Sequence, residues 1–270
     1  MTSRIHDDRY RRREARAPQS RFRALPIARE TMRQVFARRA LLLFLASALG
    51  PFLLGAGGLV LMSRVPEMAQ ALPPIAELYS RYLRLQLVFA VLLSVWAGAG
   101  LVADDLRTGA LLVYLSRPLH RSDYVLGKLS VLFGLNAAVI AVPPLLLWAL
   151  GAALDPEGTS LRGPLFLPLS IAAQALLAAA VLSLLTLGAS AIAGSAALAG
   201  VLLVGALIVA DGALLVAPEA ARPLLRLLSV PGDLTSIGRV VFGLAPDPAA
   251  AHWSAALFAL AAIAAAMAMR

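Results

Sequence analysis

The longest apolar stretch of the chain, Gly163–Ala210, reads GPLFLPLSIAAQALLAAAVLSLLTLGASAIAGSAALAGVLLVGALIVA and holds no charged residue over 48 positions. A helix needs about 20 mainly apolar residues to cross a bilayer, so this stretch is long enough for two membrane spans. Small, weakly apolar residues cluster near its middle, at Gly188–Gly194, and predict a turn there. The stretch therefore predicts one span at 165–187 and a second at 191–210.

Four other charge-free runs also have the length of a span: Ala40–Ser63, Leu85–Ala103, Leu129–Leu154 and Pro248–Met269. The composition, 60% hydrophobic and 14% charged, is far from that of soluble domains, which have roughly 45–50% and 25%. The sequence predicts an all-α integral membrane protein, and it excludes a soluble globular enzyme. Six transmembrane helices are expected, at about 40–62, 85–103, 129–152, 165–187, 191–210 and 249–269.

The segments outside these spans are too short to form an enzymatic domain. The longest have 39, 25 and 37 residues, whereas an independent domain typically has ~100; they are Met1–Arg39, Asp104–Lys128 and Asp211–Asp247. The chain has no cysteine, and its three histidines lie on separate segments without metal-ligand spacing. We therefore expect no catalytic, cofactor or metal site on this chain.

Positive charge is concentrated at the N-terminus, where Met1–Arg39 holds 12 arginines and 4 acidic residues. With the N-terminus inside the cell, cytoplasmic segments carry 17 Lys and Arg residues and outer segments 7, as the positive-inside rule requires. Both termini are therefore expected in the cytoplasm. We interpret residues 1–21 as a disordered basic tail that enforces this orientation; binding of nucleic acid or anionic lipid is the rival interpretation.

Arg21–Arg39 changes character just before the first span. Ala28, Met32, Val35 and Phe36 recur at helical spacing, while Arg29 and Arg33 lie on another face. The pattern predicts an amphipathic helix on the inner membrane surface, with its arginines near anionic headgroups. A plain cytosolic extension of the first span is the alternative.

The last outer segment, Asp211–Asp247, is too apolar for a free loop. Leu224, Leu225, Leu227 and Leu228 predict one or two short interfacial or re-entrant helices, and Pro231–Gly232 is expected to break the pattern.

Polar residues inside spans are few, and such residues often mark functional positions. They include Asn136 and Gln174, which could line a translocation pathway or hydrogen-bond neighbouring helices; the others are Gln86, Ser94, Ser183 and Thr186. None is an acid or base at mid-membrane, which disfavours ion-coupled transport. Pro51 and Pro143–Pro144 predict kinks in the first and third spans.

The loop between the second and third spans, Asp104–Lys128, reads DDLRTGALLVYLSRPLHRSDYVLGK. Its acidic start suits a helix N-terminus, Leu111–Leu115 forms an apolar segment, and Ser116–Pro118 breaks it. A short helix held at the membrane surface in this way suits docking into a groove on a soluble partner.

These residues closely resemble the permease subunits of type-2, exporter-class ABC transporters. In that family an acidic, Arg-x-Gly segment leads into a Leu-rich stretch, a Ser-Arg-Pro turn, a further arginine, and a Tyr-x-x-Gly-Lys that opens the third span. The matching residues here are Asp105, Arg107, Gly109, Ser116, Arg117, Pro118, Arg121, Tyr124, Gly127 and Lys128. The motif covers about a tenth of the chain, although the six-span architecture of residues 22–270 agrees throughout. The short C-terminus departs from the family.

The resemblance implies a permease subunit of the inner (plasma) membrane, paired with a second copy or a related permease. A separate ATPase subunit, which carries the ATP and magnesium, would bind the loop and drive transport. The residues expected to make this ATPase-coupling loop are Asp104, Asp105, Arg107, Gly109, Leu112, Ser116, Arg117, Pro118, Arg121, Asp123 and Lys128. An energy-independent channel or scaffold subunit and an intramembrane enzyme are the alternatives.

Overall fold

A computed structural model describes residues 24–37, 39–65, 73–110, 121–155, 166–216, 218–219, 221 and 229–244. These residues form helices and no strand. In chain order the helices are α1 (Ala24–Phe36), α2 (Arg39–Ala48), α3 (Gly50–Arg64), α5 (Ile75–Leu93), the π-helix η1 (Ser94–Gly98), α6 (Gly100–Thr108), α8 (Arg121–Leu154), α9 (Leu167–Ile192), α10 (Ala196–Val216) and α12 (Val230–Val241).

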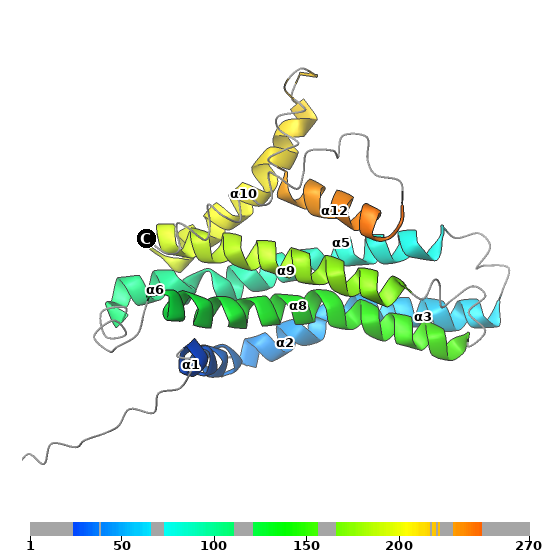
Figure 1. The fold of residues 1–270 in the computed structure, drawn as a ribbon, viewed down its shortest axis with the longest axis horizontal. Helices are drawn as coiled ribbons and strands as arrows, with labels where there is room; N and C mark the ends of the chain where they lie inside the picture. The colour runs from blue at the N-terminus through cyan, green and yellow to red at the C-terminus, as the bar shows by residue number, and fades with distance from the viewer. Residues whose placement is uncertain are drawn as a thin grey trace, which may run out of the picture.

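Within the described residues, four helical segments are long and apolar enough to cross a membrane: Arg39–Arg64, Ile75–Thr108, Arg121–Leu154 and Leu167–Ile192. They run along the long axis of the molecule, with α8 packed against α9 and α5 at its centre (Figure 1). Each of the first four predicted spans falls on one of these segments. The chain is therefore a multi-pass helical membrane protein.

The six-span count is not established by the described residues. The predicted fifth span falls on α10, whose apolar part, Ala196–Val209, is shorter than a span. The predicted sixth span, 249–269, lies outside the described residues, as do the tail 1–21 and Leu224–Leu228.

The turn before α10 lies slightly later than the glycine cluster predicts. Gly188 and Ser190 belong to α9, and the helix ends where Ala193 adopts an extended conformation, with φ −75° and ψ 140°. The second span is also longer than predicted, since α5 begins at Ile75. There Glu77 pairs with Arg81 one turn later, at 3.2 Å, and so supports helix beyond the apolar run.

A single glutamine, Gln86, links the two spans that carry a proline away from their ends. Pro143 has no N–H, so the carbonyl of Val139 loses its helical partner. The Gln86 side-chain amide donates to that carbonyl and to the carbonyl of Ala48, each at 2.9 Å. Ala48 ends α2 just before Pro51, so Gln86 ties the second span to the first and the third.

The second span is interrupted by η1, where Ala99 N–H donates to the carbonyl of Ser94 at 2.9 Å. Ser190 of α9 secures the end of this segment, because its hydroxyl donates to the carbonyl of Ala99 and accepts from the N–H groups of Val102 and Ala103. Ser190 is not among the polar residues predicted within spans, because the sequence pattern placed it in the turn at Gly188–Gly194.

Two shorter helices pack on the outside of the bundle. α1 is seen nearly along its axis where it crosses α8, so it lies at a steep angle to the spans (Figure 1). α12 covers α9 and α5 at the opposite end. Pro231, where the leucine pattern was expected to break, occupies the first turn of a new helix, α12, whose N-cap, Ser229, accepts a hydrogen bond from Gly232 N–H.

Candidate functional site

We call the end of the bundle where α6 ends and α8 begins the loop end, and the opposite end the α12 end. At the loop end, Lys128 Nζ lies 2.5 Å from Asp105 Oδ2 and also donates to the carbonyl of Leu101. The Tyr124 hydroxyl donates to the same carboxylate oxygen at 2.7 Å. The lysine and aspartate side chains are 7% and 21% exposed, so this is a largely buried ion pair that joins α6 to α8.

The local sequence explains how these three side chains meet. Tyr124 and Lys128 are four residues apart in α8 and so lie on one face, with Lys128 Nζ 5.0 Å from the centre of the Tyr124 ring. Asp104 and Asp105 do not start a helix, as the acidic pair predicts; they lie in the last turns of α6, which continues the second span. α6 ends at Gly109 with φ 70°, a left-handed conformation that favours glycine. We call Asp105, Tyr124 and Lys128 the brace.

Gly127 places α1 against the brace. A Cβ at this position would come 2.9 Å from both the carbonyl oxygen of Ala24 and the side chain of Ile27. Only a glycine therefore allows α1 to approach α8 so closely. The first turns of α1, the end of α6 and the start of α8 form one packed unit.

The remaining described residues of the predicted loop lie nearer the surface. Asp104 is half-exposed and Arg107 exposed, and they lie 3.7 Å apart in a weak pair within α6. Arg121 is exposed and Asp123 half-buried in the first turn of α8. The predicted coupling set thus divides into a buried part and an exposed part, a distinction that residue spacing did not reveal.

Leu112, Ser116, Arg117 and Pro118 lie outside the described residues, as does the whole apolar segment Leu111–Leu115. Its two described flanks, α6 and α8, are the helices that the brace joins.

Asn136 lies at the centre of a polar network between three spans. Its amide donates to Ser94 and Ser183, each at 3.0 Å, and its carbonyl oxygen accepts from the Ser94 hydroxyl at 3.2 Å. All three side chains are fully buried. Asn136 therefore hydrogen-bonds neighbouring helices, which is one of the two roles that its position in a span predicts.

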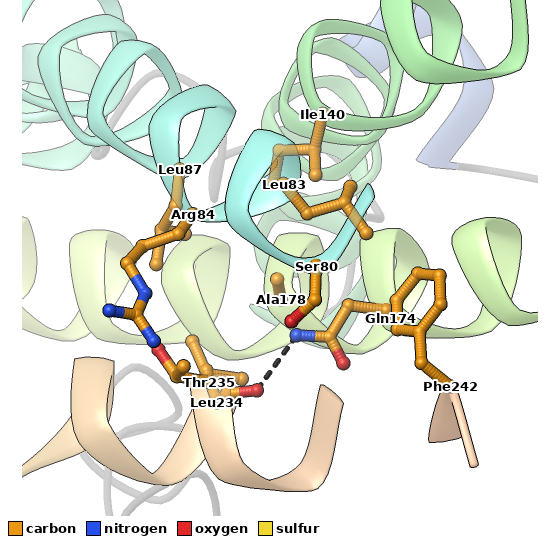
Figure 2. A pocket seen from close by; sticks show the side chains of 10 residues that line it. All are labelled: Ser80, Leu83, Arg84, Leu87, Ile140, Gln174, Ala178, Leu234, Thr235 and Phe242. Carbon is orange, nitrogen blue, oxygen red and sulfur yellow. Dashed lines mark hydrogen bonds between the residues drawn. The ribbon is translucent and has the colours of Figure 1, made fainter. Parts of the chain in front are cut away.

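Gln174 lines a small pocket near the α12 end. The cavity, ≈ 20 Å³, is the size of about one water molecule and lies between α5, α8, α9 and α12. Figure 2 shows Gln174 facing this cavity, with Arg84 and Ser80 on the α5 side. The Gln174 side-chain amide donates to the carbonyl of Leu234 at 2.7 Å. Among the described residues, Gln174 Oε1 has no hydrogen-bond partner.

The described residues indicate no chemistry other than hydrogen bonding and ion pairing. The described residues contain no group of three His, Cys, Asp or Glu side chains that could hold a metal ion.

In comparisons with known proteins, no protein-family model and no curated protein matches the chain.

Proposed function

We propose that this chain is the permease subunit of an ATP-driven ABC transporter, and that loop 104–128 couples it to a separate ATPase subunit. The observation that best supports the proposal is the brace. A buried ion pair holds the two helices that flank the apolar loop segment, directly where a partner would exert force.

The brace gives the loop a mechanical role. A push or pull on residues 111–120 acts on α6 and α8 together, because Asp105 and Lys128 join them at 2.5 Å. These helices continue into the second and third spans, which α9 contacts along its length. Movement of the loop would therefore be passed to three spans at once rather than lost in a flexible hairpin.

The other parts of the proposal follow from the family resemblance. The chain would sit in the plasma membrane with both termini in the cytoplasm and pair with a second permease. ATP and magnesium would be bound by the partner ATPase, so this chain would not itself be an enzyme. Asn136 would hold neighbouring spans together by hydrogen bonds, and Gln174 would line the small pocket. An energy-independent channel or scaffold subunit is the second candidate; the absence of a mid-membrane acid or base is compatible with it.

Co-expression with candidate ATPases, beginning with any encoded beside this chain, tests the proposal. Leu112→Asp should abolish co-purification, because it forces a charge into a contact that we expect to be desolvated. Leu112→Met keeps the apolar volume and should preserve it. Arg117→Glu combined with Arg121→Glu should weaken binding in a salt-dependent manner, as expected of charges at the rim of an interface.

Insertion of each variant is checked independently. The chain has no cysteine, so single cysteines can be introduced and labelled with an impermeant reagent. A cysteine at Thr108 should stay protected from outside the cell and one at Glu219 should react. If Leu112→Asp inserts normally and still forms a complex that transports, the loop is not the coupling element.

A further inference from the structure

Gln174 brings a buried polar atom to the cavity at the α12 end. The side chain is 8% exposed and lines the cavity, and its Nε2 donates to the carbonyl of Leu234 at 2.7 Å. With the nitrogen turned to Leu234 (Figure 2), the oxygen Oε1 is left to face the cavity, and no described residue hydrogen-bonds to it. Buried polar atoms in folded proteins nearly always have a partner, so we expect a small one inside the cavity.

Helix α12 covers the Gln174 carboxamide from one side. A Cβ at Gly238 would lie 2.5 Å from Nε2 and 2.7 Å from Oε1, so the carboxamide rests directly on the backbone of α12. One turn earlier in α9, the Ser170 hydroxyl donates to the carbonyl of Val241 at 2.8 Å and holds the same helix in place. The cavity is therefore the space from which a small partner can reach Oε1.

Two hydroxyl groups also line the cavity, and they offer different hydrogen bonds. The Thr235 hydroxyl donates its proton to the carbonyl of Pro231 at 2.7 Å, so Thr235 Oγ1 can only accept a further bond. Ser80, half-buried on α5, carries a hydroxyl that can donate or accept. Together with Gln174 Oε1, the cavity offers two acceptors and one group that can donate.

We propose that this cavity binds one ordered water molecule that joins α5, α9 and α12. The water donates to Gln174 Oε1 and Thr235 Oγ1 and accepts from the Ser80 hydroxyl. A volume of ≈ 20 Å³ holds one water, and about three polar partners are usual for a buried one.

The charges and acceptors around the cavity disfavour an ion as the occupant. An anion would face two acceptor oxygens, those of Gln174 and Thr235. Arg84 lines the same cavity, and its positive charge disfavours a cation. The site needs no ATPase partner, so it stands or falls separately from the proposed function.

Radiolytic labelling of the full-length protein in nanodiscs tests for the water. A short X-ray pulse splits water into hydroxyl radicals, these oxidise adjacent side chains, and mass spectrometry locates the products. Phe242 lines the cavity and is 2% exposed, whereas Phe89 is half-buried against Phe44 and does not line it. Phe242 should be oxidised more than Phe89 despite its lower exposure, because the bound water lies beside it.

Rapid mixing with heavy-oxygen water before the pulse measures how fast the bound water exchanges. The isotope should enter the Phe242 product more slowly than that of Phe166, which is 50% exposed and reports bulk water. Ser80→Ala should speed its entry about five-fold, the weight of one neutral hydrogen bond. Ser63→Ala is the matched control, because Ser63 is also half-buried but donates to Val60 of its own helix at 2.8 Å. It should change nothing.

A variant that fills the cavity gives a second test. Ala178 is 4% exposed and lines the cavity, so Ala178→Val puts apolar volume where the water would lie. Oxidation of Phe242 should then be lost. Oxidation that persists at the original level would mean that the radicals come from elsewhere, which contradicts the site.

Four further results would overturn the proposal. An unlabelled Phe242 in the unmodified protein would mean that the cavity is dry. Isotope entry at Phe242 as fast as at Phe166 would mean that the cavity is open to bulk solvent. Equal exchange in the Ser80→Ala and Ser63→Ala proteins would mean that the water does not join α5. Labelling of Phe242 that appears only when sodium chloride is replaced by choline gluconate would mean that an ion occupies the site.

Discussion

The two ends of the bundle each carry an ion pair between helices, but the pairs differ in burial and geometry. At the loop end, Lys128 and Asp105 are 2.5 Å apart and 7% and 21% exposed. At the α12 end, Arg239 and Glu77 are 3.4 Å apart and 33% and 20% exposed. The first pair joins α6 to α8, which flank a loop; the second joins α12 to the start of α5.

The difference predicts unequal consequences when each pair is broken. Removing one partner of a buried pair leaves an uncompensated charge and costs about 3–5 kcal/mol. An exposed pair is screened by solvent and salt, and its loss typically costs about 0–1 kcal/mol. The loop end should therefore be the more rigid junction.

The largest effect is expected from Asp105→Asn, which leaves Lys128 buried without the carboxylate that it contacts. Its free energy of unfolding should fall by about 3 kcal/mol, at the low end of the range for buried pairs because Asp105 retains some exposure. Reversible unfolding in mixed detergent micelles measures this loss. Asp104→Asn is the matched control, since Asp104 is a half-exposed neighbour in a weak 3.7 Å pair, and it should cost less than about 1 kcal/mol.

A double variant sharpens the result. Asp105→Leu with Lys128→Met removes both charges and should be less destabilising than Asp105→Asn alone, since apolar residues can replace a buried pair at little cost. Equal losses in the Asp104 and Asp105 variants would show that the brace does not stabilise the loop end.

The sequence singled out the residues of the loop end but not their arrangement, since it predicted that a helix starts at Asp104 and Asp105, and both lie in the last turns of α6. The brace residues lie in a short stretch with a distinctive pattern, and Tyr124, Gly127 and Lys128 are within one turn or so of each other. Charge-free length likewise predicted the four spans. The division of the loop into buried and exposed residues was not predictable, because Asp104 and Asp105 differ only in the direction that α6 gives them.

Contacts between distant segments carried no local signal. Gln86 binds the carbonyl that Pro143 frees, 53 residues away from Val139 in sequence, and no periodicity records such a pair. The start of α12 did carry a usable signal: Ser229 two residues before Pro231 is a suitable N-cap with a proline in the first turn. Its docking on α9 through Gln174 was not predictable, because nothing near Leu234 marks a partner.

A smaller effect is expected from Gly127→Ala, which tests packing beside the brace. The added Cβ would lie 2.9 Å from backbone and side-chain atoms of α1, so α1 must shift, at a cost of about 1–3 kcal/mol. Hydrogen exchange of the α1 amides should become faster. Gly134→Ala in the same helix is the control: it meets no atom within 4 Å and should be neutral or slightly stabilising, by up to about 1 kcal/mol. Similar behaviour of the two variants would mean that α1 is not held by close contact with α8.

The smallest effect is expected at the α12 end, from Glu77→Gln. Glu77 pairs with Arg81 in its own helix at 3.2 Å and with Arg239 of α12 at 3.4 Å. Because Arg81 is 65% exposed and Arg239 is 33% exposed, solvent screens both pairs, and the variant should lose at most about 1 kcal/mol of unfolding free energy.

Much of that loss should disappear at 1 M salt, where the screening length falls to about 3 Å. The Asp105→Asn loss should persist at the same salt concentration, because its partner is buried. Unfolding of both variants at low and high salt makes the comparison directly, and a salt-resistant loss at Glu77 as large as that at Asp105 would show that the two ends are held with equal strength.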